Sequence, residues 1–264
     1  MGAGAIVTND GWILTASSVV ASEKASYLIA LDDRQVFPAQ KVFRDVQLGV
    51  AFLKIEVNNL TVASFQPRRD LSPGQSTFLF GRNGNVFASV IKNPQFAAGK
   101  SINDLVRSSE NFYKLILLQE AAPDEFVGGP AVTLDGQIFG IVKNKNGEII
   151  PFEHFAEALK TQVKMEKWKQ PYLGITFFDL SEVLNSLETM KNGVKIKAVK
   201  NDSPGSAVLM PQDIILKIEN EELNAENNLP EILAAYKPNT TLKFTILRNG
   251  QELKLDVNLA NNSD

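Results

Sequence analysis

The sequence predicts a mainly β protein built from two units, and three observations support this prediction. Short apolar runs of strand type recur about every 8 to 12 residues through the first half, which is typical of a barrel or sandwich and not of a parallel α/β sheet. Turn pairs such as Asn83-Gly84 and Asp135-Gly136 separate the runs, because Gly and Asn tolerate the positive φ angles of tight turns. The length of 264 residues exceeds that of one average domain.

The first unit is predicted to consist of strands followed by one helix. Each strand is an apolar or β-branched run bounded by turn residues. The predicted strands are Ala5–Thr8, Trp12–Thr15, Tyr27–Leu31, Val50–Ile55, Thr77–Phe80, Val86–Ile91, Leu115–Leu118 and Gln137–Val142. From Pro151 to Val163 the apolar residues recur every three or four positions, as Phe152, Phe155 and Leu159 do. This spacing predicts a helix that begins after a proline.

The charged stretch Lys164–Gln170 is predicted to be a linker, and Pro171 opens the second unit. This unit mixes strands with two helices, Ser181–Thr189 and Leu229–Tyr236, and its polar tail Ala260–Asp264 is expected to fray. Its predicted strands are Val194–Val199, Asp213–Ile218, Thr241–Arg248 and Glu252–Leu259. The predicted domains are therefore residues 1–163 and 171–264, joined by the linker 164–170.

Composition excludes several classes of function. The net charge is −3, from 27 basic and 30 acidic residues, so no basic face is available to bind nucleic acid. With 0 cysteines and 1 histidine, the chain has no disulfide, thiolate nucleophile or Cys/His zinc site, and we expect no metal or cofactor. No run reaches the roughly 18 apolar residues of a membrane span, and the start has no signal-peptide pattern.

Three blocks of the first unit carry a family resemblance. They are Gly2–Thr15 (G-A-G-A-I-V-T-N-D-G-W-I-L-T), Leu48–Ile55 (L-G-V-A-F-L-K-I) and Val127–Ile141 (V-G-G-P-A-V-T-L-D-G-Q-I-F-G-I). In the same order they resemble G-S-G-F-I-I-x-x-D-G-Y-I-L-T, D-L-A-V-L-K-I and S-G-G-P-L-V-N-x-x-G-x-V-I-G-I of the HtrA (DegP-type) trypsin-like serine proteases. The resemblance implies a trypsin-like double β-barrel over residues 1–163.

The resemblance also locates the family's catalytic positions, which hold Ser18, Gly49 and Val127 in place of histidine, aspartate and serine. A triad needs a hydroxyl that an imidazole deprotonates and a carboxylate that orients the imidazole. Glu125, Phe126 and Val127 would form a degenerate oxyanion loop, with a carboxylate where negative charge develops. The implied protein is a pseudoprotease, that is, not an enzyme, and Phe126 and Val127 would make its cleft more apolar.

Other routes to catalysis are alternative hypotheses. His154 follows Ile150-Pro151 at the predicted helix start, where a helix-surface or partly packed role is expected. An unorthodox serine hydrolase would need a dyad of Ser17 or Ser18 with Lys54. Solvated surface charge is expected for the carboxylate pairs Asp32-Asp33, Asp124-Glu125 and Glu221-Glu222.

The second unit carries another resemblance. Tyr172-Leu173-Gly174-Ile175 resembles the Y-L-G-I carboxylate-binding loop of an HtrA-type PDZ domain, and Ser203–Ile215 is similar to its S-P-A-x-x-A-G-L-x-x-G-D-I-I segment. The resemblance implies a PDZ domain, an α+β fold with a small, partly open barrel, over residues 171–264. Its peptide-binding residues would be Tyr172, Leu173, Gly174 and Ile175, whose N–H groups hold a terminal carboxylate while the next strand edge accepts the peptide.

Two glycines of that segment are replaced, by Val208 and Gln212, so this turn is expected to follow a different path. Peptide binding and a PDZ-like fold that packs on its neighbour and binds no free terminus therefore both remain open.

The functional prediction is a binding protein for polypeptides, acting as a scaffold or chaperone-like module through the PDZ domain and the residual cleft. Its partners would be proteins or peptides, including free C-termini. The alternative is a regulatory or structural subunit that assembles with an active HtrA paralogue or a membrane complex. The resemblance implies a periplasmic or extracytoplasmic location, with membrane anchoring only through an N-terminal segment that this sequence does not contain. The sequence leaves the oligomeric state open.

Overall fold

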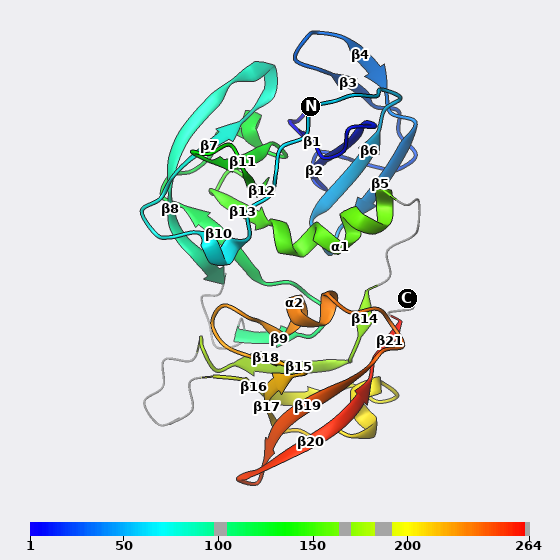
Figure 1. The fold of residues 1–264 in the computed structure, drawn as a ribbon, viewed down its shortest axis with the longest axis vertical. Coiled ribbons are helices and arrows are strands. Elements are labelled where there is room, and N and C mark those ends of the chain that lie inside the picture. The colour runs from blue at the N-terminus through cyan, green and yellow to red at the C-terminus, as the bar shows by residue number, and fades with distance from the viewer. Residues whose placement is uncertain (98–104, 164–169, 183–191, 262–264) are drawn as a thin grey trace. The chain divides into compact units, whose positions relative to one another are not determined.

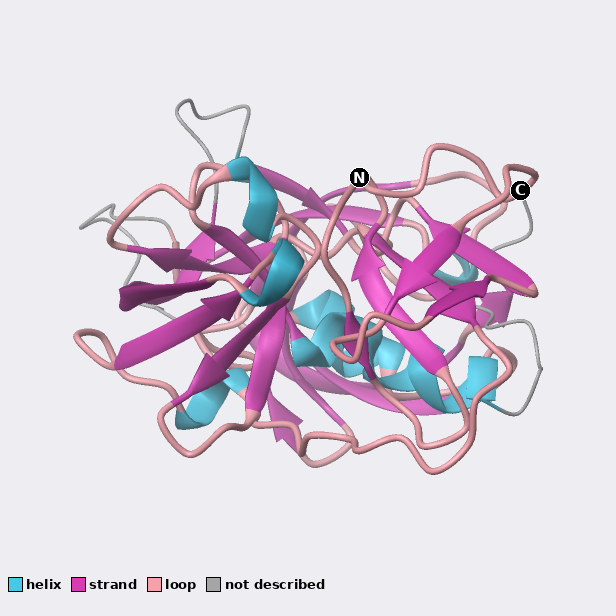
Figure 2. Ribbon diagram, turned by 90° about the horizontal axis from the view of Figure 1, so that it is seen from above, coloured by secondary structure: helices cyan, strands magenta, loops and turns pink. Residues whose placement is uncertain are grey.

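The computed structural model describes residues 1–97, 105–163, 170–182 and 192–261. Contacts divide the chain into two compact units, one of Met1–Phe96 with Lys114–Glu166 and one of Ala97–Tyr113 with Lys167–Asp264. Strands dominate both units, and the described helices are few and short (Figure 2). The predicted boundaries leave residues 97–113 in the first unit, whereas contacts group Ala97 and the described residues 105–113 with the second.

The first unit begins with an antiparallel sheet in the order β1-β2-β6-β5 and a separate hairpin, β3-β4 (Figure 1). These strands are β1 (Ala5–Ile6), β2 (Trp12–Ala16), β3 (Leu28–Ala30), β4 (Val36–Pro38), β5 (Lys41–Asp45) and β6 (Val50–Lys54). All five residues of β2 are buried, because the strand lies inside the sheet and is apolar except at Thr15. In the register of β2 with β6, Trp12 lies opposite Lys54 and Ala16 opposite Val50.

The second half of this unit is a closed barrel in the order β10-β13-β12-β11-β7-β8. Its strands are β7 (Ser76–Phe80), β8 (Val86–Ala97), β10 (Lys114–Leu118), β11 (Pro130–Thr133), β12 (Ile138–Val142) and β13 (Glu148–Pro151). Apolar side chains from every strand fill the interior, with Leu79, Phe139 and Ile149 fully buried. The helix α1 (Phe152–Val163) follows β13 directly, which confirms the predicted helix and its entry through Pro151.

Turns in this unit have the backbone that their residue types predict. Asn83 (φ 61°) and Gly84 (φ 73°) connect β7 to β8, and Gly136 (φ 77°) connects β11 to β12. These are left-handed conformations, which Asn and Gly adopt at the lowest cost.

The second unit is one antiparallel sheet in the order β20-β19-β17-β16-β15-β9, with β18 on β17 and a separate pair β14-β21. Its strands are β9 (Val106–Ser108), β14 (Pro171–Tyr172), β15 (Ile175–Asp179), β16 (Val194–Val199), β17 (Ile214–Ile218), β18 (Glu221–Glu222), β19 (Thr241–Arg248), β20 (Gln251–Asn258) and β21 (Ala260–Asn261). The helix α2 (Leu229–Ala234) covers the core: Leu229 and Leu233 pack with Phe177 and Phe244 of the sheet.

Three sequence predictions for this unit have different outcomes. The helix predicted over Leu229–Tyr236 is present but ends at Ala234. The helix predicted over Ser181–Thr189 lies almost entirely outside the described residues, and Ser181 and Glu182 form a turn. The tail prediction is wrong for Ala260–Asn261, because these two residues pair with β14 as a strand. Among the described residues, no helix has the length and apolar character needed to cross a membrane.

Candidate functional site

The structure brings the three segments that hold Ser18, Gly49 and Val127 together. Ser18 is exposed in the turn after β2, and the neighbouring Ser17 donates its N–H to the carbonyl of Gly49 over 2.8 Å. On the other side, Ala3 donates its N–H to the carbonyl of Val127 over 3.2 Å. The side chains present at this junction are thus a hydroxymethyl group, a hydrogen and an isopropyl group.

The loop around Val127 forms hydrogen bonds within itself and with β12. Phe126 donates its N–H to the carbonyl of Pro123 over 3.0 Å, and Val127 donates to that of Asp124 over 3.2 Å. Gly128 donates to the carbonyl of Val142 over 2.8 Å, and Gly129 to that of Phe126 over 2.9 Å. An oxyanion hole needs N–H groups that point at a developing charge. In this structure all four of these N–H groups bind protein oxygens instead.

The two residues before Val127 have partners within the first unit. The carboxylate of Glu125 accepts a hydrogen bond from Nδ2 of Asn85 over 3.0 Å. Phe126 is only 3% exposed and packs on Phe87, with ring centroids 5.7 Å apart. The expectation that Phe126 makes a cleft more apolar is therefore wrong, because the barrel interior takes this ring.

The alternative catalytic residues lie elsewhere. The strand register places Lys54 opposite Trp12, at the far end of β6 from Ser17 and Ser18, and its Nζ lies 3.4 Å from Oδ2 of Asp10. Lys54 and the two serines lie at opposite ends of the paired strands β2 and β6, so Lys54 cannot act as the base of a Ser-Lys dyad. His154 is 3% exposed on α1, so of the two expected roles, on the helix surface or partly packed, the structure supports the packed one.

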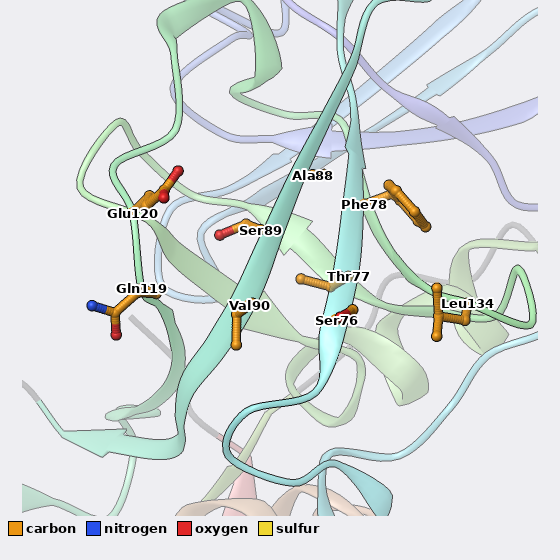
Figure 3. Close-up of a pocket in the computed structure, with 9 residues that line it drawn as sticks. All are labelled: Ser76, Thr77, Phe78, Ala88, Ser89, Val90, Gln119, Glu120 and Leu134. Atoms are coloured by element: carbon orange, nitrogen blue, oxygen red, sulfur yellow. The ribbon is translucent and has the colours of Figure 1, made fainter.

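A pocket on the closed barrel is separate from the predicted site residues. Figure 3 shows its lining, which comes from β7, β8 and the two loops that hold Gln119, Glu120 and Leu134. Glu120 is the one ionisable side chain among the residues that line it. Thr77 donates its hydroxyl to the carbonyl of Val132 over 2.7 Å, so this hydroxyl is already engaged.

Tyr172–Ile175, the predicted carboxylate-binding loop, connects β14 to β15 in the second unit. Tyr172 ends β14, Ile175 begins β15, and between them Gly174 has a φ of 79°. The Leu173 side chain is fully buried in the core, and its carbonyl accepts a hydrogen bond from the N–H of Gly205 over 2.9 Å. The side chain and the carbonyl of Leu173 thus hold the loop in place. The N–H groups of residues 173 to 175 are left to bind another acceptor.

A carboxylate and a hydroxyl from the same chain accept these N–H groups. Oε1 of Glu110 accepts the N–H of Gly174 at 2.9 Å and that of Leu173 at 3.4 Å. The N–H of Ile175 donates to the hydroxyl of Ser109 over 3.1 Å, and Ser109 donates its own N–H to the carbonyl of Ile175 over 3.0 Å. Sequence reasoning missed Ser109 and Glu110, since nothing in a short polar segment marks it as the partner of a loop some 60 residues away.

The residues before Ser109 extend this contact along the strand. β9 pairs antiparallel with β15, with Ser108 opposite Thr176 and Arg107 opposite Phe177 (Figure 1). Arg107 also contacts Glu182, with Nη2 3.0 Å from Oε2. The free edge of β15, where a peptide is expected to add as a strand, is therefore covered by residues 106–108.

A buried polar pair supports this segment. The hydroxyl of Tyr113 donates to Oδ2 of Asp179 over 2.6 Å, and both residues are buried. Burial raises the pKa of Tyr113 well above its ordinary value, and the negative charge of Asp179 raises it further. The guanidinium of Arg107 lies 4.8 Å from the centroid of the Tyr113 ring.

The turn with the replaced glycine is held in place by an ion pair. Gln212 has a φ of 77°, so it adopts the left-handed backbone that a glycine adopts without strain. The next residue, Asp213, is 2% exposed and is bound by Arg248 through two contacts, Nε to Oδ1 at 2.8 Å and Nη2 to Oδ2 at 2.7 Å. Gln212 thus takes the strained backbone of the replaced glycine, and the ion pair of Asp213 with Arg248 holds the next residue in place.

Comparisons with known proteins agree with this two-part structure. The trypsin-like peptidase domain family matches residues 2–141, more than half of the chain, and the PDZ domain family matches residues 171–259. A probable periplasmic serine endoprotease DegP-like of Marinomonas sp. (strain MWYL1) is 27% identical over 271 residues. One of Pseudomonas fulva (strain 12-X) is 26% identical over 273 residues. The alignments cover 98% and 97% of this chain but only 56% and 55% of those proteins.

Solved structures share the fold. The HtrA-type protease AlgW with tripeptide superposes with a TM-score of 0.74 at 21% identity, covering 99% of this chain and 89% of that chain. AlgW with decapeptide gives a TM-score of 0.69 at 22% identity, with 99% and 82% covered. The serine endoprotease from Yersinia pestis gives 0.60 at 22% identity, with 98% and 88% covered.

These comparisons correct one sequence-based prediction. Ser18, Gly49 and Val127 at the catalytic positions predict that the chain is not an enzyme. That prediction is contradicted, because the relatives are named serine endoproteases and the family that matches the first unit is a peptidase family, which points to a protease. The family and the fold follow from the comparisons: the chain belongs to the trypsin-like peptidases and is of the HtrA type, with a PDZ domain after its peptidase domain.

Proposed function

We propose that this HtrA-type chain binds other polypeptides by their C-termini, in a scaffold or chaperone-like role, at the groove formed by Tyr172–Ile175 and the edge of β15. One observation supports this proposal above all others. Two consecutive N–H groups, those of Leu173 and Gly174, hold the carboxylate of Glu110. Backbone groups that hold a side-chain carboxylate in this geometry have the chemistry to hold a terminal one.

The strand edge supplies the second half of the recognition. A peptide that adds to β15 gains main-chain hydrogen bonds, which give affinity without demanding a particular sequence. Residues 106–108 already make this type of pairing with β15, so the edge is geometrically able to accept a strand. Proteins of the same fold are described with peptides, AlgW with a tripeptide and AlgW with a decapeptide, which supports peptide binding by this chain.

The cellular setting follows from the relatives. Both DegP-like relatives are named periplasmic, and we place this chain in the same compartment. The absence of cysteine suits an oxidising compartment, where a free thiol is a liability.

The test is a peptide-binding measurement with a matched control. The probe is a fluorescein-labelled octapeptide, I-N-D-L-V-R-S-S, which copies residues 102–109 and ends in a free carboxylate in place of the Glu110 side chain. Its C-terminally amidated form is the control, and both are titrated by fluorescence anisotropy against the wild-type chain and the Glu110→Ala variant.

We expect saturable binding of the free-carboxylate peptide and at least tenfold weaker binding of the amidated one, because a charge-assisted hydrogen bond is worth about 1.5–3 kcal/mol. Equal binding of the two peptides, or binding of neither by either protein, would contradict the proposal. It would favour instead a PDZ-like domain that packs on its neighbour and binds no free terminus.

A further inference from the structure

We infer that residues 106–110 are a built-in ligand of the peptide groove, with Glu110 in the place of a terminal carboxylate, so that an external C-terminus binds only when this segment leaves. The inference rests on the proposed function for the external ligand. The occupation of the groove by the segment stands on the structure alone.

The backbone of the segment follows the course expected for a bound peptide. It runs antiparallel to β15 and extends the sheet by one strand at the edge, on the side opposite β16. Ser109 is the last residue that pairs with β15, through its N–H and the carbonyl of Ile175. A peptide that ended at residue 109 would have its terminal carboxylate at the loop, next to the N–H groups of residues 173 to 175.

Glu110 supplies the charge that such a terminus would carry. Its side chain turns back to the loop, where Oε1 accepts the N–H groups of Leu173 and Gly174. The hydroxyls of Ser108 and Ser109 donate to the same carboxylate over 2.7 and 2.5 Å, which fixes its rotamer. The carboxylate is thus held by four donors.

Contacts on both sides of the strand anchor the segment. The Arg107 and Glu182 side chains are 11% and 14% exposed, so their ion pair is largely shielded from water. Nε2 of Gln170 donates to the carbonyl of Glu110 over 2.6 Å. Tyr113 joins the hydrophobic core of the second unit, beside residues of α2 such as Leu229.

Chain connectivity keeps the segment close to the groove when it is released. In the sequence, the segment lies between β8, which ends at Ala97, and β10, which begins at Lys114. The chain is therefore connected to strands of the barrel on both sides of the segment. A tethered ligand competes at a high effective concentration, and the apparent Kd of an external peptide rises by the inverse of the fraction of open groove.

The first experiment asks whether the segment occupies the groove, with no peptide present. The chain has no cysteine, so Ser108→Cys with Thr176→Cys introduces the only two thiols. Because Ser109 and Ile175 are hydrogen-bonded partners, the adjacent pair is of the non-hydrogen-bonded type, with Cα atoms about 4.5 Å apart, which suits a disulfide. Mild oxidation is expected to cross-link this pair nearly completely, whereas Ser108→Cys with Glu252→Cys, on the opposite edge of the sheet, stays reduced. Failure of the first pair to cross-link would overturn the inference, whatever any peptide does.

The second experiment measures competition, using the I-N-D-L-V-R-S-S octapeptide. Glu110→Ala is expected to tighten its binding by about tenfold or more, because the segment loses its charge-assisted hydrogen bonds. The matched control Glu252→Ala, which removes an exposed carboxylate from β20, leaves the affinity unchanged. The oxidised Ser108→Cys/Thr176→Cys protein is expected to lose binding and to recover it on reduction.

The outcomes separate the two proposals. Equal affinity of the oxidised and reduced proteins, or of wild type and Glu110→Ala, would overturn the built-in ligand as a competitor. If the cross-link forms but no variant binds the octapeptide or its amidated form, the failure falls on the proposed function, and the segment remains a permanent strand of the sheet.

Discussion

The hydroxyl of Tyr113 donates a hydrogen bond of 2.6 Å to Oδ2 of Asp179, and the two residues are 66 positions apart in the sequence. Burial, and then the charge of Asp179, raise the pKa of Tyr113 well above its ordinary value of about 10. Above about pH 10 the unfolded chain therefore loses a proton that the folded chain keeps. The contribution of Tyr113 to the free energy of unfolding is complete below about pH 10, and it is lost as the pH rises through the pKa that Tyr113 has in the folded chain.

Tyr113→Phe is expected to remove this part of the alkaline loss of stability. The free energy of unfolding, from urea denaturation followed by circular dichroism between about pH 8 and about pH 11, would fall less steeply in the variant than in wild type. Leu134→Ala, at an exposed position of the first unit, removes no titrating group, so it is the control and keeps the wild-type slope. An unchanged slope in Tyr113→Phe would show that Tyr113 ionises alike in the folded and unfolded states.

Removal of Arg248 is expected to leave a buried carboxylate without its cation. Asp213 is 2% exposed and binds Arg248 through two contacts of 2.8 and 2.7 Å. Arg248→Met should lower the free energy of unfolding by about 3–5 kcal/mol, the cost of an uncompensated buried charge. Lys254→Met, an exposed position on β20, should stay within about 0.5 kcal/mol of wild type.

The double variant Asp213→Asn/Arg248→Met tests the cause of that loss. If the buried charge is responsible, the double variant recovers part of the stability, measured by the same urea titration. No recovery would assign the loss to the packing of the arginine side chain.

Gly174→Ala is expected to disrupt the carboxylate-binding loop. The residue has a φ of 79°, and a Cβ there would overlap with Ser203, whose Oγ would lie 2.7 Å from it. Gly250 is a matched control, because it has a φ of 80° and nothing lies within 4 Å of a Cβ built there. Both alanine variants should lose about 1–2 kcal/mol from the left-handed backbone, and only Gly174→Ala should lose more and also lose octapeptide binding. Equal stability of the two variants would show that Ser203 moves aside.

Phe126→Ala is expected to destabilise the first unit, because the ring fills the barrel interior. The side chain is 3% exposed and contacts Phe87, and a Cβ at Gly81 would lie only 2.8 Å from its Cδ1. The cavity should cost about 3–5 kcal/mol in thermal or urea denaturation. Leu134→Ala, at a position 68% exposed, should change stability by less than about 0.5 kcal/mol. A loss as small as that of Leu134→Ala would mean that Phe126 does not fill the barrel.

Local pattern in the sequence determined the two units, the helix that begins after Pro151, and the turns at Asn83-Gly84 and Gly136. Each of these depends on residues within a few positions of one another, where periodicity, proline and glycine act directly on the backbone. The family resemblance lies in the same kind of local information, and the comparisons confirm it.

Only the tertiary structure decided what binds the loop. β9 has three residues, too few for an alternating pattern, and Glu110 lies 64 positions from Gly174. A strand of that length forms because the free edge of β15 offers it hydrogen-bond partners, and the loop attracts a carboxylate because its N–H groups point outward. Both causes belong to residues distant in the sequence, so no property of residues 106–110 alone predicts their place in the second unit.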